Sequence, residues 1–132
     1  MATELVCVGL AGILVVFYIL APAVARALSS PAWAAGNRDG TAPQTGLRSQ
    51  RAERAARNIL ETFPVFAAVT LAVVLGGATS TLSAIGAVLY VVARVAYWPA
   101  YVYGLGPLRS MIYGLSMLGI VLELIALLLG AL

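Results

Sequence analysis

The chain has 132 residues, of which 62% are hydrophobic and only 10% are charged. This composition excludes an ordinary soluble domain and predicts a single integral membrane domain over residues 1–132. The formal net charge is +3 and histidine is absent, which removes the commonest neutral-pH base and metal ligand. We therefore expect neither a protein-ligated transition metal nor a nucleic-acid partner.

Four apolar runs follow one another along the chain, each near the ~20 residues that a helix needs to cross ~30 Å of hydrocarbon. Because lipid offers no partner to unpaired backbone groups, continuous apolar spans of this length predict α-helices. Short connections between the later runs indicate antiparallel neighbours. The expected fold class is an all-α membrane protein, a four-transmembrane-helix bundle with helices at about 3–28, 47–77, 81–103 and 107–131.

The first run could instead be a signal peptide, since the stretch APAVARA (21–27) contains a small-residue cleavage pattern. However, the residues before it carry Glu4 and no basic side chain. The run is also longer than the ~7–15 apolar residues at the centre of a signal peptide. We expect this segment to be retained as a membrane span.

Residues 29–46 are rich in Pro, Gly, Ser and Asn and are predicted to form the one long loop. The following residues contain no helix breaker, so the second helix is predicted to begin near Leu47, before it enters the bilayer. Most arginines lie between the first two spans, which places this loop in the cytoplasm and both termini outside. The use of arginine without lysine suggests a GC-rich genome and hence a bacterial cytoplasmic membrane.

Polar residues of the second helix form a stripe. At about 100° per residue they fall within a sector about 120° wide. Arginines near the start of the helix could simply bind anionic lipid headgroups, the interpretation that we favour for Arg48 and Arg51. Deeper in the membrane, a carboxylate such as Glu61 persists mainly by facing a polar interior. The stripe consists of Arg51, Arg54, Arg57, Asn58 and Glu61.

The third helix presents a matching face, because Tyr90, Arg94, Tyr97 and Tyr101 follow one another at i, i+4, i+7 and i+11. Since the Glu61 carboxylate needs a partner and Arg94 lies near mid-membrane, we expect the two to form an ion pair.

The fourth helix begins with PLRSMIYGLS, which sets Arg109, Tyr113 and Ser116 on one face with Ser110 beside it. The free amides and dipole of the helix start, together with Arg109, predict a site for an anion or a readily ionised thiol. Further along, Glu123 is a polar group within the span whose simplest explanation is a contact between helices. Glutathione would match the charges of the three helices, as nucleotides or phospholipid headgroups also could.

The stretch RAERAARNILETFP (51–64) resembles the second-helix signature of the MAPEG family, the membrane-associated proteins in eicosanoid and glutathione metabolism, whose core is R-x-x-R-N-x-x-E. Further matches follow in order, ARVAY with Tyr101 in the third helix and PLRSMIY at the start of the fourth. The resemblance covers all four spans. It implies a homotrimer that binds glutathione as co-substrate between subunits, near the cytoplasmic side.

The resemblance also implies roles for individual residues. Arg109 would stabilise the glutathione thiolate and Ser110 would donate a hydrogen bond to it, which makes these two the candidate catalytic residues. The arginines, Asn58 and Glu61 would hold the peptide part, and the tyrosines would shape the pocket. The candidate cofactor-binding residues are Arg26, Arg54, Arg57, Asn58, Glu61, Arg94, Tyr97, Tyr101 and Tyr113.

Tyr97 stands where a prostaglandin-forming branch of the family has a histidine, so prostaglandin isomerisation is not implied. The expected function is that of a glutathione-dependent transferase or peroxidase acting on a lipophilic electrophile or hydroperoxide. A non-catalytic lipid-binding or scaffold member of the family is the alternative. A small four-helix drug exporter fits less well, because such a protein carries a membrane-embedded acid in its first helix and Glu4 lies too near the terminus.

Overall fold

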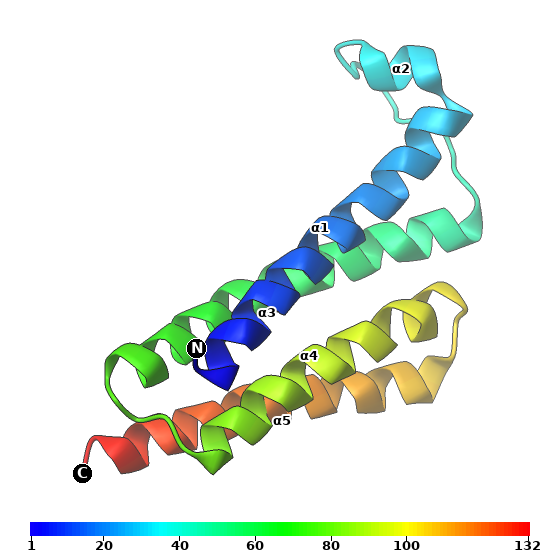
Figure 1. Cartoon of the computed structure of the whole chain (residues 1–132). Coiled ribbons are helices and arrows are strands. Elements are labelled where there is room, and N and C mark those ends of the chain that lie inside the picture. The colour runs from blue at the N-terminus through cyan, green and yellow to red at the C-terminus, as the bar shows by residue number, and fades with distance from the viewer.

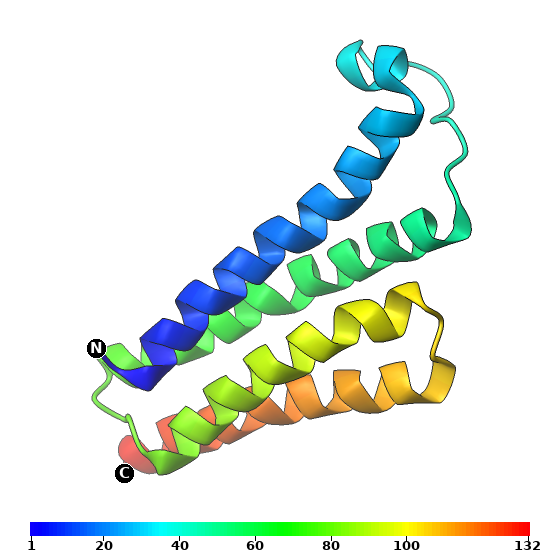
Figure 2. The same cartoon turned by 45° about the vertical axis from the view of Figure 1, so that its right-hand side comes forward.

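The computed structural model describes all residues, 1–132, and contains only helices (Figure 1). All but the second helix are long and apolar enough to cross a membrane, and consecutive long helices run in opposite directions (Figures 1 and 2). This architecture confirms the predicted fold class. The helices are α1 (Thr3–Ser29), α2 (Pro31–Ala35), α3 (Leu47–Leu75), α4 (Thr81–Val102) and α5 (Gly106–Gly130).

Both termini and the α3–α4 turn lie at one end of the bundle, whereas α2 and the α4–α5 turn lie at the other (Figure 2). At this second end α1 and α4 finish while α3 and α5 begin. We call it the arginine-rich end, because it carries Arg26, Arg38, Arg48, Arg51, Arg54, Arg57 and Arg109.

The segment 29–46, predicted as an uninterrupted loop, contains the short helix α2. Pro31 occupies its first turn, where the missing N–H of proline costs no hydrogen bond and its fixed φ suits a helix. The prediction of a loop throughout was therefore wrong at Pro31–Ala35.

A contact between glycines brings α4 and α5 close together. A Cβ atom added to Gly86 would lie 2.6 Å from the carbonyl oxygen of Gly119, and one added to Gly119 would lie 2.6 Å from that of Gly86. Small residues allow such close approach of membrane helices, where packing rather than the hydrophobic effect drives association. By contrast, a Cβ added to Gly114 of α5 would have no atom within 4 Å.

Aromatic side chains join α1 and α3 to α4. Phe66 of α3 stacks on Tyr90 of α4 with ring centroids 4.0 Å apart. Tyr18 of α1 is fully buried and its hydroxyl donates a 2.6 Å hydrogen bond to the carbonyl oxygen of Arg94. Since buried tyrosine hydroxyls need a partner, this bond fixes the depth of α1 beside α4.

Two buried carboxyl groups join helices toward the end that holds the termini. The hydroxyl oxygen of Thr70 lies 3.0 Å from both carboxyl oxygens of Glu123, which links α5 to α3. The Ser83 hydroxyl donates to Glu4 over 2.5 Å, which links α4 to α1. Glu123 therefore forms a contact between helices.

Candidate functional site

The polar stripe of α3 faces outward on one side of the bundle. Arg54, Arg57 and Glu61 are exposed, whereas Ala55 and Ile59 on the opposite face are fully buried. This division follows from the helical period, because the alanines and Ile59 pack inward while the charged residues point away from the core. The stripe lines a cavity of about 310 Å³ together with side chains of α4 and α5. Its lining residues are Arg54, Arg57, Asn58, Glu61, Tyr97, Tyr101 and Arg109.

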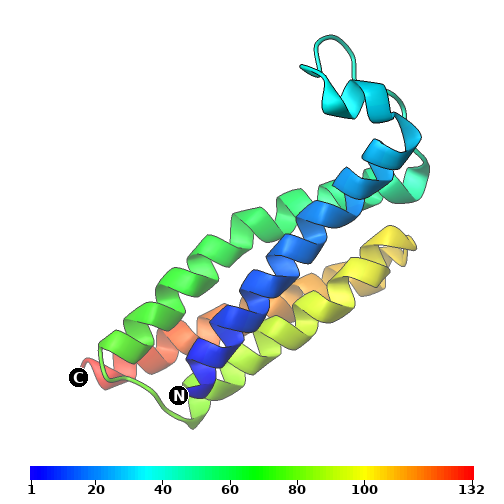
Figure 3. The same cartoon turned by 45° about the horizontal axis from the view of Figure 1, so that its top comes forward.

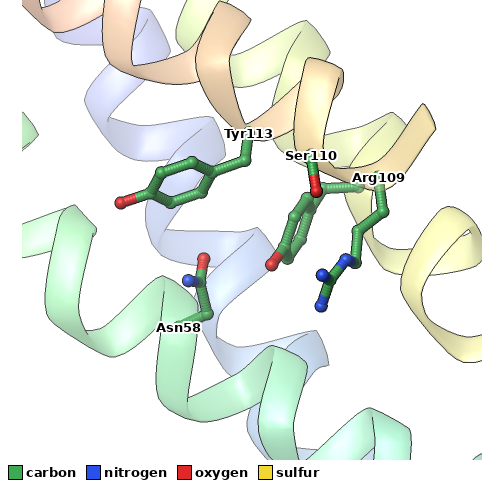
Figure 4. Close-up of a pocket in the computed structure, with 5 residues that line it drawn as sticks. Asn58, Arg109, Ser110 and Tyr113 are labelled. Atoms are coloured by element: carbon green, nitrogen blue, oxygen red, sulfur yellow. The ribbon is translucent and has the colours of Figure 1, made fainter. Parts of the chain in front are cut away.

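A second cavity of about 230 Å³ adjoins the first and shares Asn58, Tyr97 and Arg109 with it. Its other lining residues are Ser110 and Tyr113. Figure 4 shows Arg109, Ser110 and Tyr113 of α5 directed toward α3, from which Asn58 faces them. We call the two adjoining cavities the rim pocket. Three successive helices, α3, α4 and α5, thus contribute to one hollow at the arginine-rich end.

Tyrosine rings support the cationic side chains of the rim pocket. The Arg109 guanidinium lies 4.7 Å from the ring centroid of Tyr101, and that of Arg54 lies 6.0 Å from the same ring. Tyr97 packs edge-on against Tyr101, with centroids 5.6 Å apart. Cation–π contacts of this kind position a guanidinium without using its N–H groups, so these remain free to bind a ligand.

Arg94 is fully buried behind the rim pocket. Its Nη1 donates a 2.6 Å hydrogen bond to Oδ1 of Asn58, while Nε and Nη2 have no partner. The rings of Tyr90, Tyr97 and Tyr113 surround the guanidinium with centroids 5.5, 5.0 and 5.4 Å away. Arg94 therefore keeps its positive charge beneath the pocket with no carboxylate to neutralise it.

The expected ion pair between Arg94 and Glu61 was wrong. The chain contains one salt bridge, between Arg26 and Glu53, and Glu61 is exposed while Arg94 is buried. The side chains of Asn58 and Glu61 differ by about 60° around α3 at 100° per residue, and Asn58 is the one turned inward to α4.

The charges of the rim pocket are consequently unpaired within the chain. Arg54, Arg57 and Arg109 lack a carboxylate partner, and Glu61 lacks a cationic one. No side chain caps the start of α5, so the positive end of its dipole is not offset there. Pro107 has no N–H, and that of Leu108 donates to the carbonyl oxygen of Leu105. Such a site suits a ligand with several negative groups and one positive group.

Arg26 is not brought together with the other candidate residues. It lies near the end of α1 and forms the ion pair with Glu53 of α3. Within one chain, the structure thus unites nine of the eleven candidates in the rim pocket and places Arg94 directly behind it.

Arg51 has a role inside the protein, although its position near the start of the second helix predicted a contact with lipid headgroups. Arg51 is half-buried, and its Nη1 donates a 3.4 Å hydrogen bond to the carbonyl oxygen of Val102. Its guanidinium packs on Gly104, where an added Cβ would lie 2.6 Å from Nη1 and where φ is +72°. Arg51 thereby holds the α4–α5 turn against α3, beside Arg54 and Arg109. In the sequence, Gly104 is the residue that could have indicated this contact, because glycine allows both the positive φ and the close approach of the Arg51 guanidinium.

Arg48, the other arginine assigned to lipid headgroups, is exposed, and its guanidinium lies 4.9 Å from the ring centroid of Tyr103.

The comparisons with known proteins agree with the second-helix motif. The sequence model of the MAPEG family matches residues 4–129, nearly the whole chain. No curated protein and no solved structure matches the chain. The match includes all four long helices and every residue of the rim pocket. The chain therefore belongs to the MAPEG family and is an integral, multi-pass membrane protein of the glutathione and eicosanoid metabolism kind.

Proposed function

We propose that this protein is a glutathione-dependent membrane transferase or peroxidase in which the rim pocket binds glutathione. The observation that carries the proposal is the convergence of Arg54, Arg57, Arg109 and Glu61, all without partners in the chain, around one hollow. Members of the family generally use glutathione, and the chain belongs to that family.

The charged groups of glutathione match this arrangement. Its two carboxylates suit guanidinium groups, which bind carboxylates through two parallel hydrogen bonds. Arg54 and Arg57 of α3 offer these groups, and Glu61 one turn further offers a carboxylate to the ammonium group. The thiol then extends into the inner cavity, toward Arg109, Ser110 and Tyr113.

Arg109 acts on the thiol as an electrostatic stabiliser. An arginine does not lose its proton in proteins, so it is not a base. Its positive charge and the start of α5 lower the pKa of the bound glutathione thiol by favouring the thiolate. The Ser110 hydroxyl, on the same cavity wall, donates a hydrogen bond to the sulfur.

The thiolate then reacts with a lipophilic co-substrate that arrives from the bilayer. With an electrophile, the sulfur lone pair forms a C–S bond and the leaving group departs with the electron pair of its own bond. With a hydroperoxide, the sulfur takes the distal oxygen, the O–O bond breaks and an alcohol is released. A second glutathione reduces the resulting sulfenic acid to a disulfide and water.

The positive-inside distribution of arginine supports an orientation with the arginine-rich end in the cytoplasm and both termini outside. A reporter that is active only in the cytoplasm, fused after Leu132, should therefore be inactive in a bacterial cytoplasmic membrane. Cytoplasmic activity of that fusion would overturn the orientation.

A non-catalytic lipid-binding role is the second candidate. A cavity of about 450 Å³, lined almost wholly by apolar side chains, runs along the outer face of α4 and favours lipid contact. Its lining residues are Thr81, Ala84, Ile85, Val88, Leu89 and Val92. A protein of this kind would bind lipid without turnover, which an activity assay with a generic electrophile distinguishes.

The first test is calorimetric titration of the detergent-solubilised protein with glutathione and an S-alkyl glutathione. Both compounds should bind, because the charged groups that the rim pocket recognises are present in each. Binding of neither compound would leave the proposal without support.

The second test is Arg109→Leu. Loss of an oxyanion-stabilising group lowers kcat by about 10²–10³-fold in well-studied enzymes, so conjugation of a generic electrophile should fall by at least about 100-fold. Arg48→Leu is the matched control, because it removes the same charge at the same end but lines no part of the rim pocket. Unchanged activity of the Arg109→Leu protein would refute the role given to Arg109.

A further inference from the structure

A pocket of about 230 Å³ lies at the other side of the arginine-rich end and shares no residue with the rim pocket. It is formed by the end of α1, by the residues of and after α2, and by Glu53 of α3. Figures 1 and 3 show α2 beyond the end of α1, away from the α4–α5 hairpin. Of its lining residues only Arg26 is a candidate glutathione ligand, and within the chain its guanidinium is paired with Glu53.

The lining changes from apolar to charged along the direction of α1. Ile19, Pro22 and Ala23 belong to the membrane-spanning part of the helix and form the apolar half. One turn further along α1, Arg26 begins the polar half, and Trp33 of α2 lies beside it. Tryptophan is enriched at the boundary between hydrocarbon and headgroups, so this pocket lies across that boundary.

Two guanidinium groups flank Trp33. That of Arg26 lies 5.5 Å from the indole centroid and that of Arg38 lies 5.9 Å from it. Arg38 is the only residue other than glycine with a positive φ, at 60°, and its Nε donates a 3.1 Å hydrogen bond to the carbonyl oxygen of Ala34. The strained backbone and this bond hold Arg38 over the indole while the terminal amino groups of the guanidinium stay free.

The polar half has one unmatched positive charge and one unmatched donor. Arg26 forms the ion pair with Glu53, whereas Arg38 has no carboxylate partner. The Nε1 atom of Trp33 is buried and has no hydrogen-bond acceptor. The indole N–H is enclosed by the protein, whereas Arg38 is exposed, so the Arg38 guanidinium is the group that an anion can reach.

We propose that this pocket binds the phosphodiester headgroup of an anionic phospholipid. A phosphodiester carries a single negative charge, which matches the exposed and unpaired guanidinium of Arg38. The first carbons of an acyl chain then lie against Ile19, Pro22 and Ala23. Inorganic phosphate shares the headgroup chemistry, but it would leave the apolar half of the pocket without a partner.

The test uses the fluorescence of Trp33 in the Trp98→Phe protein, because the chain has two tryptophans. The protein is held in zwitterionic micelles and titrated with phosphatidylglycerol or phosphatidylcholine whose acyl chains are brominated and quench a nearby indole. Phosphatidylglycerol should quench at a clearly lower mole fraction. Arg38→Gln should raise its half-quenching mole fraction about fivefold, as expected from the loss of one arginine–lipid contact.

Arg48→Gln is the matched control, because Arg48 is an exposed arginine at the same end and lies outside this pocket. Its half-quenching mole fraction should stay near that of the parent protein. Native mass spectrometry of the unsubstituted and Arg38→Gln proteins counts retained phosphatidylglycerol without any tryptophan change, and the substitution should lower that count.

Three results would overturn the proposal. Equal quenching by both lipids would show that the headgroup is not recognised. Equal shifts for Arg38→Gln and Arg48→Gln would show a general surface potential. Displacement of the lipid by inorganic phosphate at similar concentration would identify a site for free phosphate.

Discussion

At the scale of single residues, Asn58 contacts the buried guanidinium of Arg94 without neutralising its positive charge. Its Oδ1 accepts from Arg94, and the same residue lines both parts of the rim pocket. A carboxylate at this position would neutralise the guanidinium, whereas an amide satisfies one N–H and leaves the charge. The positive potential behind the rim pocket then adds to that of Arg109 where an anion would bind.

Asn58→Ala should destabilise the protein by about 1.5–3 kcal/mol, because the lost hydrogen bond is made by a buried charged group. Thr62→Val is the control, since it removes the 3.0 Å hydrogen bond between two neutral hydroxyls, Thr62 and Tyr90, and should cost about 1 kcal/mol. Chemical denaturation in detergent measures both. A smaller loss for Asn58→Ala than for Thr62→Val would contradict the role given to Arg94.

Asn58→Asp separates the structural role of this residue from its electrostatic role. The new carboxylate should pair with Arg94, so the folded protein should remain stable while its affinity for glutathione falls, as calorimetry would show. Undiminished affinity would mean that the charge of Arg94 does not reach the ligand.

At the scale of elements, the α4–α5 hairpin sets the shape of the rim pocket. Tyr97 and Tyr101 near the end of α4 face Arg109 and Tyr113 near the start of α5. The depth and spacing of the two helices are set by the glycine contact further along, because backbones at this distance admit no side chain between them. A substitution that separates the two helices at the glycine contact should therefore alter the geometry of the rim pocket.

Gly119→Ala tests this coupling. Its Cβ would lie 2.6 Å from the carbonyl oxygen of Gly86 and 2.8 Å from the backbone nitrogen of Tyr90, so the helices must separate. Overpacking of this kind costs about 1–3 kcal/mol. We expect lower stability on denaturation and slower conjugation, although Gly119 touches no part of the rim pocket.

Gly114→Ala on the same helix is the control. It meets no atom within 4 Å, and alanine is favoured over glycine in a helix by about 0.5–1 kcal/mol. Stability should be unchanged or slightly higher. Equal behaviour of the two alanine variants would show that the glycine contact does not hold the hairpin.

At the scale of the whole molecule, the rim pocket is open on one side. Arg54, Arg57 and Glu61 are exposed in the single chain, although charged groups within a membrane protein usually face another polar surface. We propose that a neighbouring subunit covers this side in a homotrimer, as the family resemblance implies, and that glutathione binds between subunits.

Light scattering in detergent, corrected for the bound detergent, should then give a protein mass of three times 13.7 kDa. Mixed assemblies of active and Arg109→Leu chains, reconstituted together, should lose activity in proportion to the inactive chains present. A fully active monomer would contradict the trimer and leave the open side of the pocket exposed to lipid.

Local patterns in the sequence were enough to predict the four spans and the polar stripe. The length of an apolar run is a property of neighbouring residues, and the helical period places R-x-x-R-N-x-x-E on one face whatever surrounds it. The same spacing carried the resemblance to the MAPEG family, which the family match confirms.

Only the tertiary structure decided which side chains meet across helices. Arg94 contacts Asn58 rather than Glu61, Arg51 packs on Gly104, and Arg26 pairs with Glu53. Each of these pairings depends on the rotation and depth of two helices relative to each other. A rotation of one residue, about 100°, exchanges one partner for another, and the period of a single helix contains no information on its neighbour.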